Sequence, residues 1–409
     1  MLERFRLAEN NTSVSTEFFG GLSSFLASFY IIIVNPAILS QAGMPFDAVC
    51  TATVMAAAFT TILMGLYANN PIILAPGMGL NAYFTYSVVI GKQIPPEVAL
   101  GIVFWSGMLA VTLSMLKVRE KIISLIPKQI RYAVSCGIGI FISFIGLQKG
   151  GVIISHPATL VGMGNFLDPK VITFFAGLLI SIYFVIKKYK ASLVMGILIT
   201  FILTIPLGRW YGSETIIHFD NLIAFPDFSL FGKVEILGSL KLAFIPTMLG
   251  FMFTDLFDTI STLVGVCEAG NLLDENGMPR NMKKTLIADS IATPIAAIFG
   301  TSSTTSYIES AAGIQQGART GLSSVFAGLM FLPFLFFSPT LSMFSAFTTA
   351  PILVVVGVFM MGPVSKIEWE RMSYAVPAFL AMVLIPLSFS ITTGIVVGLV
   401  SWYFLKGVK

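Results

Sequence analysis

The chain has 409 residues, of which 56% are hydrophobic and only 11% are charged. An average soluble domain carries roughly 25% charged residues, so this composition excludes an ordinary soluble fold and is typical of a helical membrane protein with many crossings. The formal net charge of +4 is spread without a block of Lys and Arg, which excludes nucleic acid as a partner. The apolar runs do not alternate with polar residues, which excludes a β-barrel.

Apolar stretches of about 20 residues, the length that crosses a bilayer as a helix, occur fourteen times along the chain. They predict an all-α polytopic membrane protein whose polar connections are too short to fold as separate domains. The expected segments are 20–40, 47–68, 72–90, 95–116, 130–148, 169–187, 190–208, 242–266, 284–300, 303–317, 321–337, 340–361, 372–387 and 389–405.

The N-terminus lacks the short apolar core and the small-residue cleavage site of a signal peptide, so we expect the first stretch to remain as a membrane helix. With the N-terminus placed inside, eighteen of the 24 Lys and Arg residues fall in cytoplasmic loops and six outside. This asymmetry follows the positive-inside rule and agrees with an even number of crossings. We therefore expect a multi-pass protein of the cell (inner) membrane with both termini in the cytoplasm.

A long outside loop at 209–241 leaves seven segments on either side. Because seven is odd, the second half is inserted upside down relative to the first. The third segment of each half is interrupted, at 70–84 and at 300–313. Paired interruptions in inverted halves are the best sequence pointer to the binding site of a secondary transporter, so we expect inverted repeats over 1–215 and 216–409.

Both interrupted segments contain residues that oppose a continuous helix. Pro71 and Pro76 break the first, and Gly77 and Gly79 allow the backbone to approach closely. In the second, the hydroxyls of the Ser/Thr run 301–306 can satisfy backbone groups left outside helical pairing. The pattern favours a short extended stretch followed by a half-helix whose first N–H groups face a ligand. Two ordinary helices packed through small residues are the alternative.

Four acids lie inside apolar segments: Asp255, Asp258, Asp289 and Glu309. A carboxylate at the centre of a membrane helix costs roughly 2.5 to 3.5 kcal/mol, so such groups are candidates for function. Asp255 and Asp258 are three residues apart, about 60° around a helix from each other, so both can face one cavity. Two close carboxylates resist joint ionisation, which makes one of them a candidate proton carrier.

Other candidates are weaker. Asn81 is an amide at membrane depth that can hydrogen-bond a ligand or a neighbouring helix. Phe25, Phe29 and Tyr30 in the first segment can stack on a planar ligand, although with 12% aromatic residues in the chain most such rings simply pack against protein or lipid. The three cysteines lie far apart without C-x-x-C spacing, so we expect no disulfide, no metal and no cofactor.

Five ordered motifs resemble those of the AzgA-like purine permeases, which belong to the nucleobase-ascorbate transporter (nucleobase:cation symporter-2) superfamily. The motifs are N-P-A-I-L at 35–39, A-P-G-M-G-L-N-A-Y-F at 75–84, T-D-L-F-D-T at 254–259, L-L-D-E-N-G at 272–277 and T-S-Y-I-E-S-A-A-G at 305–313. The resemblance implies fourteen spans in two inverted repeats, with a core domain that moves against a gate domain and short antiparallel strands in spans 3 and 10. It also implies uptake of hypoxanthine, guanine or adenine with protons.

The resemblance further implies roles for single residues. Acids on the eighth and tenth spans hold the base in this superfamily, which makes Asp258 and Glu309 the implied pair; Asn81 falls on the asparagine of the third span, and Asp255 lies beside the site. The expected substrate-binding residues are Asp258, Glu309, Asn81, Phe25, Phe29, Thr305 and Ser306, and the expected proton-coupling residues are Asp255 and Asp289.

Other functions fit parts of this pattern. A carrier of xanthine, uracil or an organic or inorganic anion with the same architecture is the nearest alternative. An intramembrane aspartyl protease would carry a G-x-G-D signature, which the chain lacks, and an ion channel fits the composition but not the inverted halves. We therefore expect a transporter rather than an enzyme, with a purine nucleobase, a proton and the lipid bilayer as partners. A monomer and a homodimer both stay open.

Overall fold

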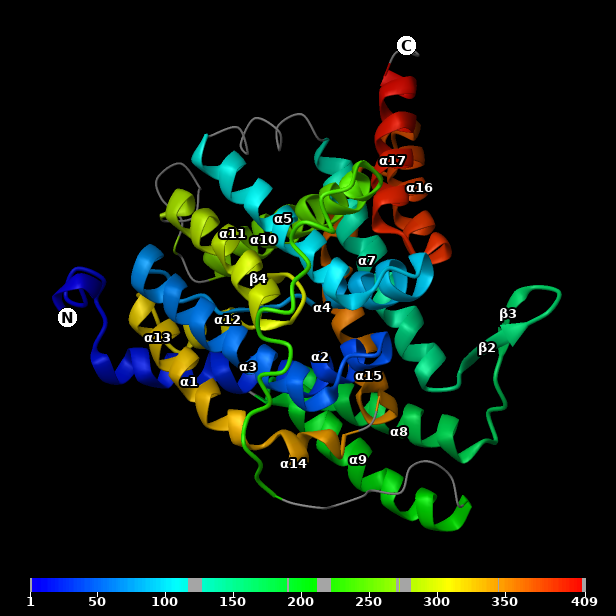
Figure 1. The fold of residues 1–409 in the computed structure, drawn as a ribbon, viewed down its shortest axis with the longest axis horizontal. Helices are drawn as coiled ribbons and strands as arrows, with labels where there is room; N and C mark the ends of the chain where they lie inside the picture. Colours follow the sequence, from blue (N-terminus) through cyan, green and yellow to red (C-terminus); the bar gives the residue numbers. More distant parts are fainter. Residues whose placement is uncertain are drawn as a thin grey trace. The chain divides into compact units, whose positions relative to one another are not determined.

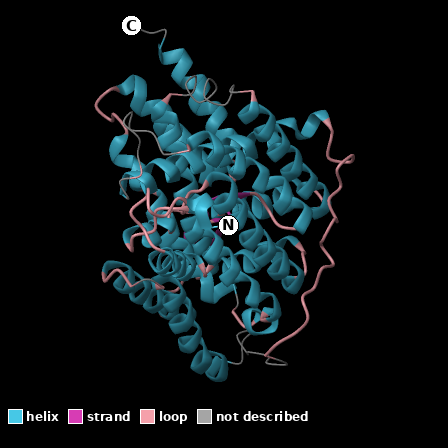
Figure 2. Ribbon diagram, turned by 90° about the vertical axis from the view of Figure 1, so that its left-hand side faces the viewer, coloured by secondary structure: helices cyan, strands magenta, loops and turns pink. Residues whose placement is uncertain are grey.

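The computed structural model describes residues 2–116, 127–189, 191–211, 222–269, 272, 281–344 and 346–406. Helices make up most of this part of the chain, and the few strands are short (Figure 2). Seven helices in the described ranges are long and apolar enough to cross a membrane. They are Val14–Ala42, Phe46–Ala68, Pro96–Met115, Lys128–Lys149, Pro169–Ile186, Leu242–Cys267 and Phe347–Lys366.

Shorter helices occupy the remaining expected positions. Four apolar ones are Ser192–Pro206, Gly321–Phe336, Met372–Ser388 and Ile391–Lys406. Helix α11, Met282–Phe299, lies at the ninth position, and two strand-containing segments lie at the third and tenth. The all-α membrane fold expected from composition is therefore confirmed, and its helices fit the fourteen expected segments.

The chain divides into two compact units, each made of two stretches of sequence. Unit 1 comprises Met1–Ile123 and Ile223–Ser338, and unit 2 comprises Ser124–Leu222 and Pro339–Lys409. Unit 1 thus holds segments 1–4 and 8–11, and unit 2 holds segments 5–7 and 12–14. This division fits the core and gate domains that the family resemblance implies, whereas the inverted repeats over 1–215 and 216–409 stay a prediction.

Unit 1 contains the interrupted segments (Figure 1). Its first half consists of α1 (Val14–Ser28), α2 (Ile31–Leu39), α3 (Phe46–Leu63), η3 (Met64–Ala68), β1 (Leu74–Pro76), α4 (Met78–Ala82), η4 (Tyr83–Ile90) and α5 (Pro96–Met115). Its second half consists of α10 (Ile245–Ala269), α11, β4 (Thr304–Ser306), α12 (Ser310–Gln315), α13 (Gly321–Phe331) and η6 (Leu332–Phe336). Single-turn elements are η1 (Leu2–Phe5), η2 (Ser40–Ala42) and η5 (Leu242–Phe244).

Unit 2 is a separate helical bundle. It contains α7 (Lys128–Lys149), the hairpin of β2 (Ile153–His156) and β3 (Leu160–Met163), α8 (Pro169–Ile186), α9 (Ser192–Tyr211), α15 (Ala346–Met360), η7 (Gly362–Lys366), α16 (Met372–Ser388) and α17 (Ile391–Lys406). The short α14 (Ser338–Ser342) lies at the boundary with unit 1. Helix α7 packs on both α15 and α16.

Strands β1 and β4 pair antiparallel, with Leu74 opposite Ser306 and Pro76 opposite Thr304. Two backbone hydrogen bonds extend the pairing beyond the strands: Gly77 N donates to Ser303 O at 2.9 Å, and Tyr307 N donates to Ile73 O at 3.0 Å. The short strands expected in spans 3 and 10 are therefore present. Three residue pairs and two flanking hydrogen bonds thus join the two halves of unit 1.

The outer edge of β1 is paired by side-chain hydroxyls. On that edge Thr61 Oγ1 of α3 accepts from Leu74 N at 3.0 Å and donates to Leu74 O at 2.9 Å. On the side that faces β4, Ser310 Oγ of α12 accepts from Ile73 N at 2.9 Å. Backbone groups inside a membrane have no bulk water to bind, so each needs an internal partner. Thr61 supplies the bonds that a third strand would otherwise make, and Ser310 continues the pairing on the β4 side.

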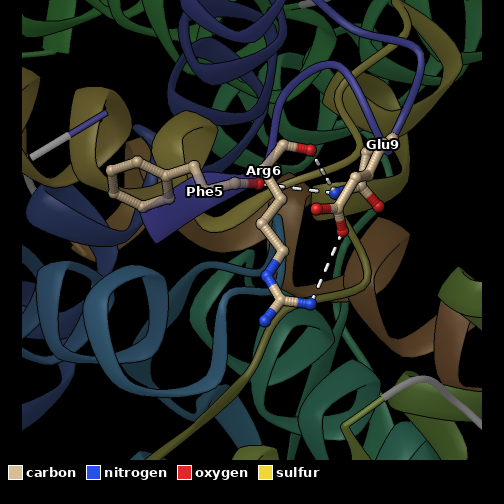
Figure 3. A network of polar contacts seen from close by, with 4 residues as sticks. Phe5, Arg6 and Glu9 are labelled. Carbon is tan, nitrogen blue, oxygen red and sulfur yellow. Dashed lines mark hydrogen bonds and ion pairs between the residues drawn. The ribbon is translucent and has the colours of Figure 1, made fainter. Parts of the chain in front are cut away.

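The N-terminal segment is held mainly by local contacts (Figure 3). Arg6 and Glu9 form an exposed ion pair at 3.5 Å, and the Asn10 side chain donates to Arg6 O at 2.8 Å. Exposed ion pairs of this kind contribute little to stability. The apolar anchor of this segment is Phe5, which is buried.

Helices in unit 1 also approach each other at glycines. A Cβ atom added at Gly65 would clash with the carbonyl oxygen of Gly321, and one added at Gly321 would clash with Gly65. Both clashes are with backbone, which cannot rotate away. The contact of η3 with α13 therefore depends on the absence of two methyl groups.

We predict that Gly65→Ala lowers the midpoint of thermal unfolding in detergent, because overpacking costs typically about 1 to 3 kcal/mol, or several degrees. The midpoint can be followed as the fraction of monodisperse protein left after heating. Gly265→Ala is the matched control, since a Cβ there would meet nothing within 4 Å. An unchanged midpoint in Gly65→Ala would show that the two helices can separate at no cost.

Candidate functional site

Five of the six side chains in the Ser/Thr run 301–306 bond to other elements of unit 1. The pairs are Thr301 with Asn35 of α2, Ser302 with Asn81 of α4, Ser303 with Thr293 of α11, Thr305 with Asp258 of α10, and Ser306 with Asp289 of α11. Alternate side chains of a strand point to opposite faces, so one short strand reaches helices on both sides. The run therefore fixes the strand among the acid-bearing helices.

Asp258 lies on α10 beside this strand. Its Oδ2 accepts from Thr305 Oγ1 at 3.3 Å. Unlike Asp255 and Asp289, Asp258 is only partly covered by protein. Thr305 thus orients a carboxylate on a residue that keeps partial exposure.

Glu309 occupies the N-cap position of α12, where its side chain makes no capping hydrogen bond, and it is also only partly covered. The hydroxyl of Tyr30 donates to its Oε1 at 2.8 Å, across a separation of 279 residues. The Tyr30 ring faces the Tyr307 ring, with centroids 6.4 Å apart and planes inclined by 29°. Tyr307 is fixed in turn, because its hydroxyl donates to Pro76 O at 2.5 Å. Two aromatic rings and one carboxylate are thus held at the strand crossing.

Asp289 is fully buried on α11. Thr259 Oγ1 donates to it, with both carboxylate oxygens at 2.9 Å, and Ser306 Oγ lies 3.2 Å from Oδ1. Asp255, one turn before Asp258 on α10, is 2% exposed. The four acids therefore form two classes: Asp258 and Glu309 are accessible, whereas Asp255 and Asp289 are enclosed.

Asn81 is fully buried inside the strand crossing. Its amide oxygen accepts from Ser302 Oγ, and its amide nitrogen lies 3.5 Å from Pro76 O. In this structure the amide supports β4 and the turn after β1, which is the interhelical role considered as the alternative. Its contact with substrate stays a prediction.

The aromatic residues of the first segment separate into two groups. Phe25 and Phe29 contact each other edge to face, and both pack against Phe334 of η6, with Phe25 also against Phe331 of α13. Tyr30, two residues past the end of α1, instead reaches Glu309. Stacking of Phe25 or Phe29 on a ligand stays a prediction.

Sequence reasoning missed several members of this network. Tyr307 was quoted within the T-S-Y-I-E-S motif but received no role, and Tyr30 was considered for its ring rather than for its hydroxyl. Thr259, the donor to Asp289, follows Asp258 directly in the T-D-L-F-D-T motif. The signal that could have found them is the need of each enclosed acid for a hydrogen-bond donor.

The half-helix after β4 differs from the expectation of N–H groups open to a ligand. Ser310, Ala311 and Ala312 donate their N–H groups to carbonyls three residues earlier, at 3.2, 3.0 and 3.0 Å. The first turn of α12 therefore closes on itself, and Glu309 is the polar group that it presents. Of the L-L-D-E-N-G motif, positions 273–277 lie outside the described residues, and the described part contains no cluster of His, Cys, Asp and Glu suited to a metal.

Solved transporters share this fold. The transmembrane domain of a cyanobacterium bicarbonate transporter, BicA, aligns with a TM-score of 0.71 at 17% identity, covering 94% of this chain and 97% of that one. The structure of SLC26A9 aligns with a TM-score of 0.65 at 10% identity, covering 96% of this chain and 65% of that one. At these identities the likeness concerns the fold alone.

Sequence relatives cover nearly the whole chain. Guanine/hypoxanthine permease PbuO of Bacillus subtilis (strain 168) is 40% identical over 99% of this chain and 94% of its own length, and adenine permease AdeP of Escherichia coli (strain K12) is 38% identical over 99% and 90%. The model of the Permease family matches residues 15–398. The chain therefore belongs to the Permease family, and its resemblance to the AzgA-like purine permeases is confirmed.

Proposed function

We propose that this protein imports purine nucleobases, namely hypoxanthine, guanine or adenine, by proton symport. The names of its relatives, guanine/hypoxanthine permeases and adenine permeases, support the substrate class. The site supports a planar ligand that carries N–H donors. On this proposal the protein lies in the cell (inner) membrane with both termini in the cytoplasm, and residues 1–215 and 216–409 are inverted repeats.

The observation that carries the proposal is the pair of accessible carboxylates at the strand crossing. Asp258 and Glu309 are held by hydroxyl donors from Thr305 and Tyr30, at 3.3 and 2.8 Å. A purine presents N–H groups along its edge, and a carboxylate accepts such groups in charge-assisted hydrogen bonds. Ligand sites of this kind combine apolar or aromatic walls with a few convergent polar groups, and here Tyr30 and Tyr307 supply the rings.

The other predicted residues are proposed to support the two acids or to line the site. Thr305 orients Asp258, and Ser306 orients Asp289, so both contribute to the site through the acids that they touch. Asn81 holds the start of β4 through Ser302 and comes within reach of substrate only if that bond is exchanged. Phe25 and Phe29, which pack against each other and against Phe334, are proposed as an aromatic wall of the site.

Proton coupling is assigned to the enclosed acids. A carboxylate inside a membrane protein is costly unless it is paired or carries a proton during part of the cycle. Asp255 shares α10 with Asp258, so a proton on it changes the field at the binding acid without contacting the substrate. Asp289, which accepts from two hydroxyls, is the second candidate.

The substrate is tested by uptake of labelled hypoxanthine, guanine, adenine, xanthine and uracil in cells that lack their own carriers. We expect uptake of at least one of the first three and competition by the unlabelled base. Uptake restricted to xanthine, uracil or an anion would replace the proposal by the same-fold alternative.

Dissipating the pH gradient should abolish accumulation above equilibrium, because the downhill movement of protons drives the uphill step. The same vesicles with sodium gradients of either direction are the control. Accumulation that persists without a proton gradient and follows sodium would overturn proton symport.

Glu309→Gln and Asp258→Asn should each weaken purine binding by about one to two decades, since a charge-assisted hydrogen bond is worth roughly 1.5 to 3 kcal/mol. Each change keeps the shape but gives the side chain a donor that faces the N–H groups of the base. Calorimetry on purified protein measures the affinity, and the exposed Glu9→Gln is the control. Wild-type affinity in both variants would make these acids structural.

Asp255→Asn should leave equilibrium binding and exchange of bound for free purine largely intact, while net uphill uptake is lost. The reason is that only the proton-driven return step depends on this acid. Binding, exchange and uphill uptake can be compared in proteoliposomes. Uphill uptake at the wild-type rate would move the proton role to Asp289, Asp258 or Glu309.

A further inference from the structure

Glu17, in the first turn of α1, is fully buried but belongs to neither class of acid at the strand crossing. Its carboxylate accepts from the backbone N–H groups of Arg319 at 2.8 Å, Thr320 at 3.2 Å and Ser323 at 3.2 Å. Arg319 and Thr320 come directly before α13, and Ser323 lies in its first turn. A carboxylate at a helix N-terminus is stabilised both by the helix dipole and by charge-assisted hydrogen bonds.

Other side chains satisfy the remaining N–H groups at the start of α13. Asn69 Oδ1 accepts from Gly321 N at 2.8 Å, and Thr320 Oγ1 accepts from Leu322 N at 3.4 Å. Because Asn69 follows η3 and Glu17 lies on α1, the start of α13 is attached to two separate parts of unit 1. Glu17 joins the start of α13 to α1, the helix that precedes Tyr30.

A hydrogen-bonded turn connects α12 to α13. Gln316 N and Ala318 N both donate to Gly313 O, at 3.0 and 3.1 Å, and Gly317 has a φ of +101°. Only Gly adopts such a conformation without strain. Five residues, 316–320, join the two helices, and the first three of them hydrogen-bond back to α12. We therefore expect a displacement of residues 319–323 to displace α12 as well.

Helix α1 packs along α12. A Cβ added at Gly20 would lie 2.6 Å from Ala318 Cβ, and one added at Gly313 would clash with Ser24. Ser24 Oγ donates to Ser310 O at 3.3 Å. Beyond the end of α1, Tyr30 donates to Glu309. The contacts of α1 with the α12–α13 pair thus run from Glu17 at one end to the binding carboxylate at the other.

We propose that Glu17 is a positioning residue for Glu309. By holding the start of α13 against α1, it sets the distance between Tyr30 and Glu309 and thereby the affinity for substrate. This inference rests on the proposed function, because it concerns the same carboxylate. It assigns to Glu17 no contact with substrate and no proton.

The test is purine binding by purified Glu17→Gln protein. Glutamine keeps the size of the side chain but places an amide donor against backbone N–H donors. We expect the dissociation constant to rise about threefold or more, in the range of couplings between connected sites, while Glu17→Asp, which keeps the charge, recovers part of the affinity. Glu9→Gln, an exposed acid near the N-terminus, is the control and should bind as the wild type does.

A double-mutant cycle distinguishes positioning from a general loss of stability. If Glu17 acts through the Tyr30–Glu309 bond, Glu17→Gln should have less effect in a Tyr30→Phe background than in the wild type. If Glu17→Gln does not yield folded protein, Gly20→Ala displaces α1 from Ala318 and should raise the dissociation constant in the same way. The cycle is then measured with that variant.

Two results would overturn the inference. One is wild-type affinity in Glu17→Gln and Gly20→Ala, with or without a lower unfolding midpoint. The other is fold-changes that multiply in the double mutant. Failure of the proposed function has a different signature, because the wild-type protein itself would then bind no purine.

Discussion

The structure of unit 1 depends on one constraint, which is that backbone N–H and C=O groups inside a membrane need partners within the protein. Two of its segments cannot be helical throughout, because prolines interrupt one and a run of hydroxyl residues the other. Each provides hydrogen-bond partners for the backbone of the other, because β1 and β4 pair with each other. Thr61 satisfies the outer edge of β1, and Ser310 satisfies the N–H group of Ile73 on the side that faces β4. The candidate site therefore lies where two segments leave the helical conformation. Two residues of β4, Thr305 and Ser306, donate from their side chains to Asp258 and Asp289.

The four acids at the strand crossing differ in burial. Asp258 and Glu309 keep access to the surroundings, whereas Asp255 and Asp289 are enclosed. Inside a protein the effective dielectric constant is lower than in water, so neighbouring charges act more strongly on one another. On the proposed function, a proton on Asp255 or Asp289 and a base on Asp258 and Glu309 are therefore linked energetically even without contact. This linkage is the physical requirement of a symporter.

The sequence predicted the elements better than their contacts. Segment positions follow from local hydropathy, and the breaks at 70–84 and 300–313 follow from proline and hydroxyl residues, so both are local properties. The partners of the Ser/Thr run are not local: Asn81 and Ser302 are 221 positions apart, and Asn35 and Thr301 are 266 apart. Glu17 was missed for a related reason, because it precedes the first apolar stretch and no local rule shows that a distant helix begins against it.

The pairing of β1 with β4 also constrains how the protein is made. Ile73 and Ser310 are 237 positions apart, with three segments of unit 2 synthesised between them. At roughly 5 to 20 residues per second, β1 emerges some tens of seconds before its partner strand exists. During that interval its backbone groups must be satisfied by Thr61, by lipid headgroups or water, or by a chaperone. The third segment is therefore expected to enter the bilayer late, and a chain cut short before residue 304 would leave an open strand edge that invites aggregation.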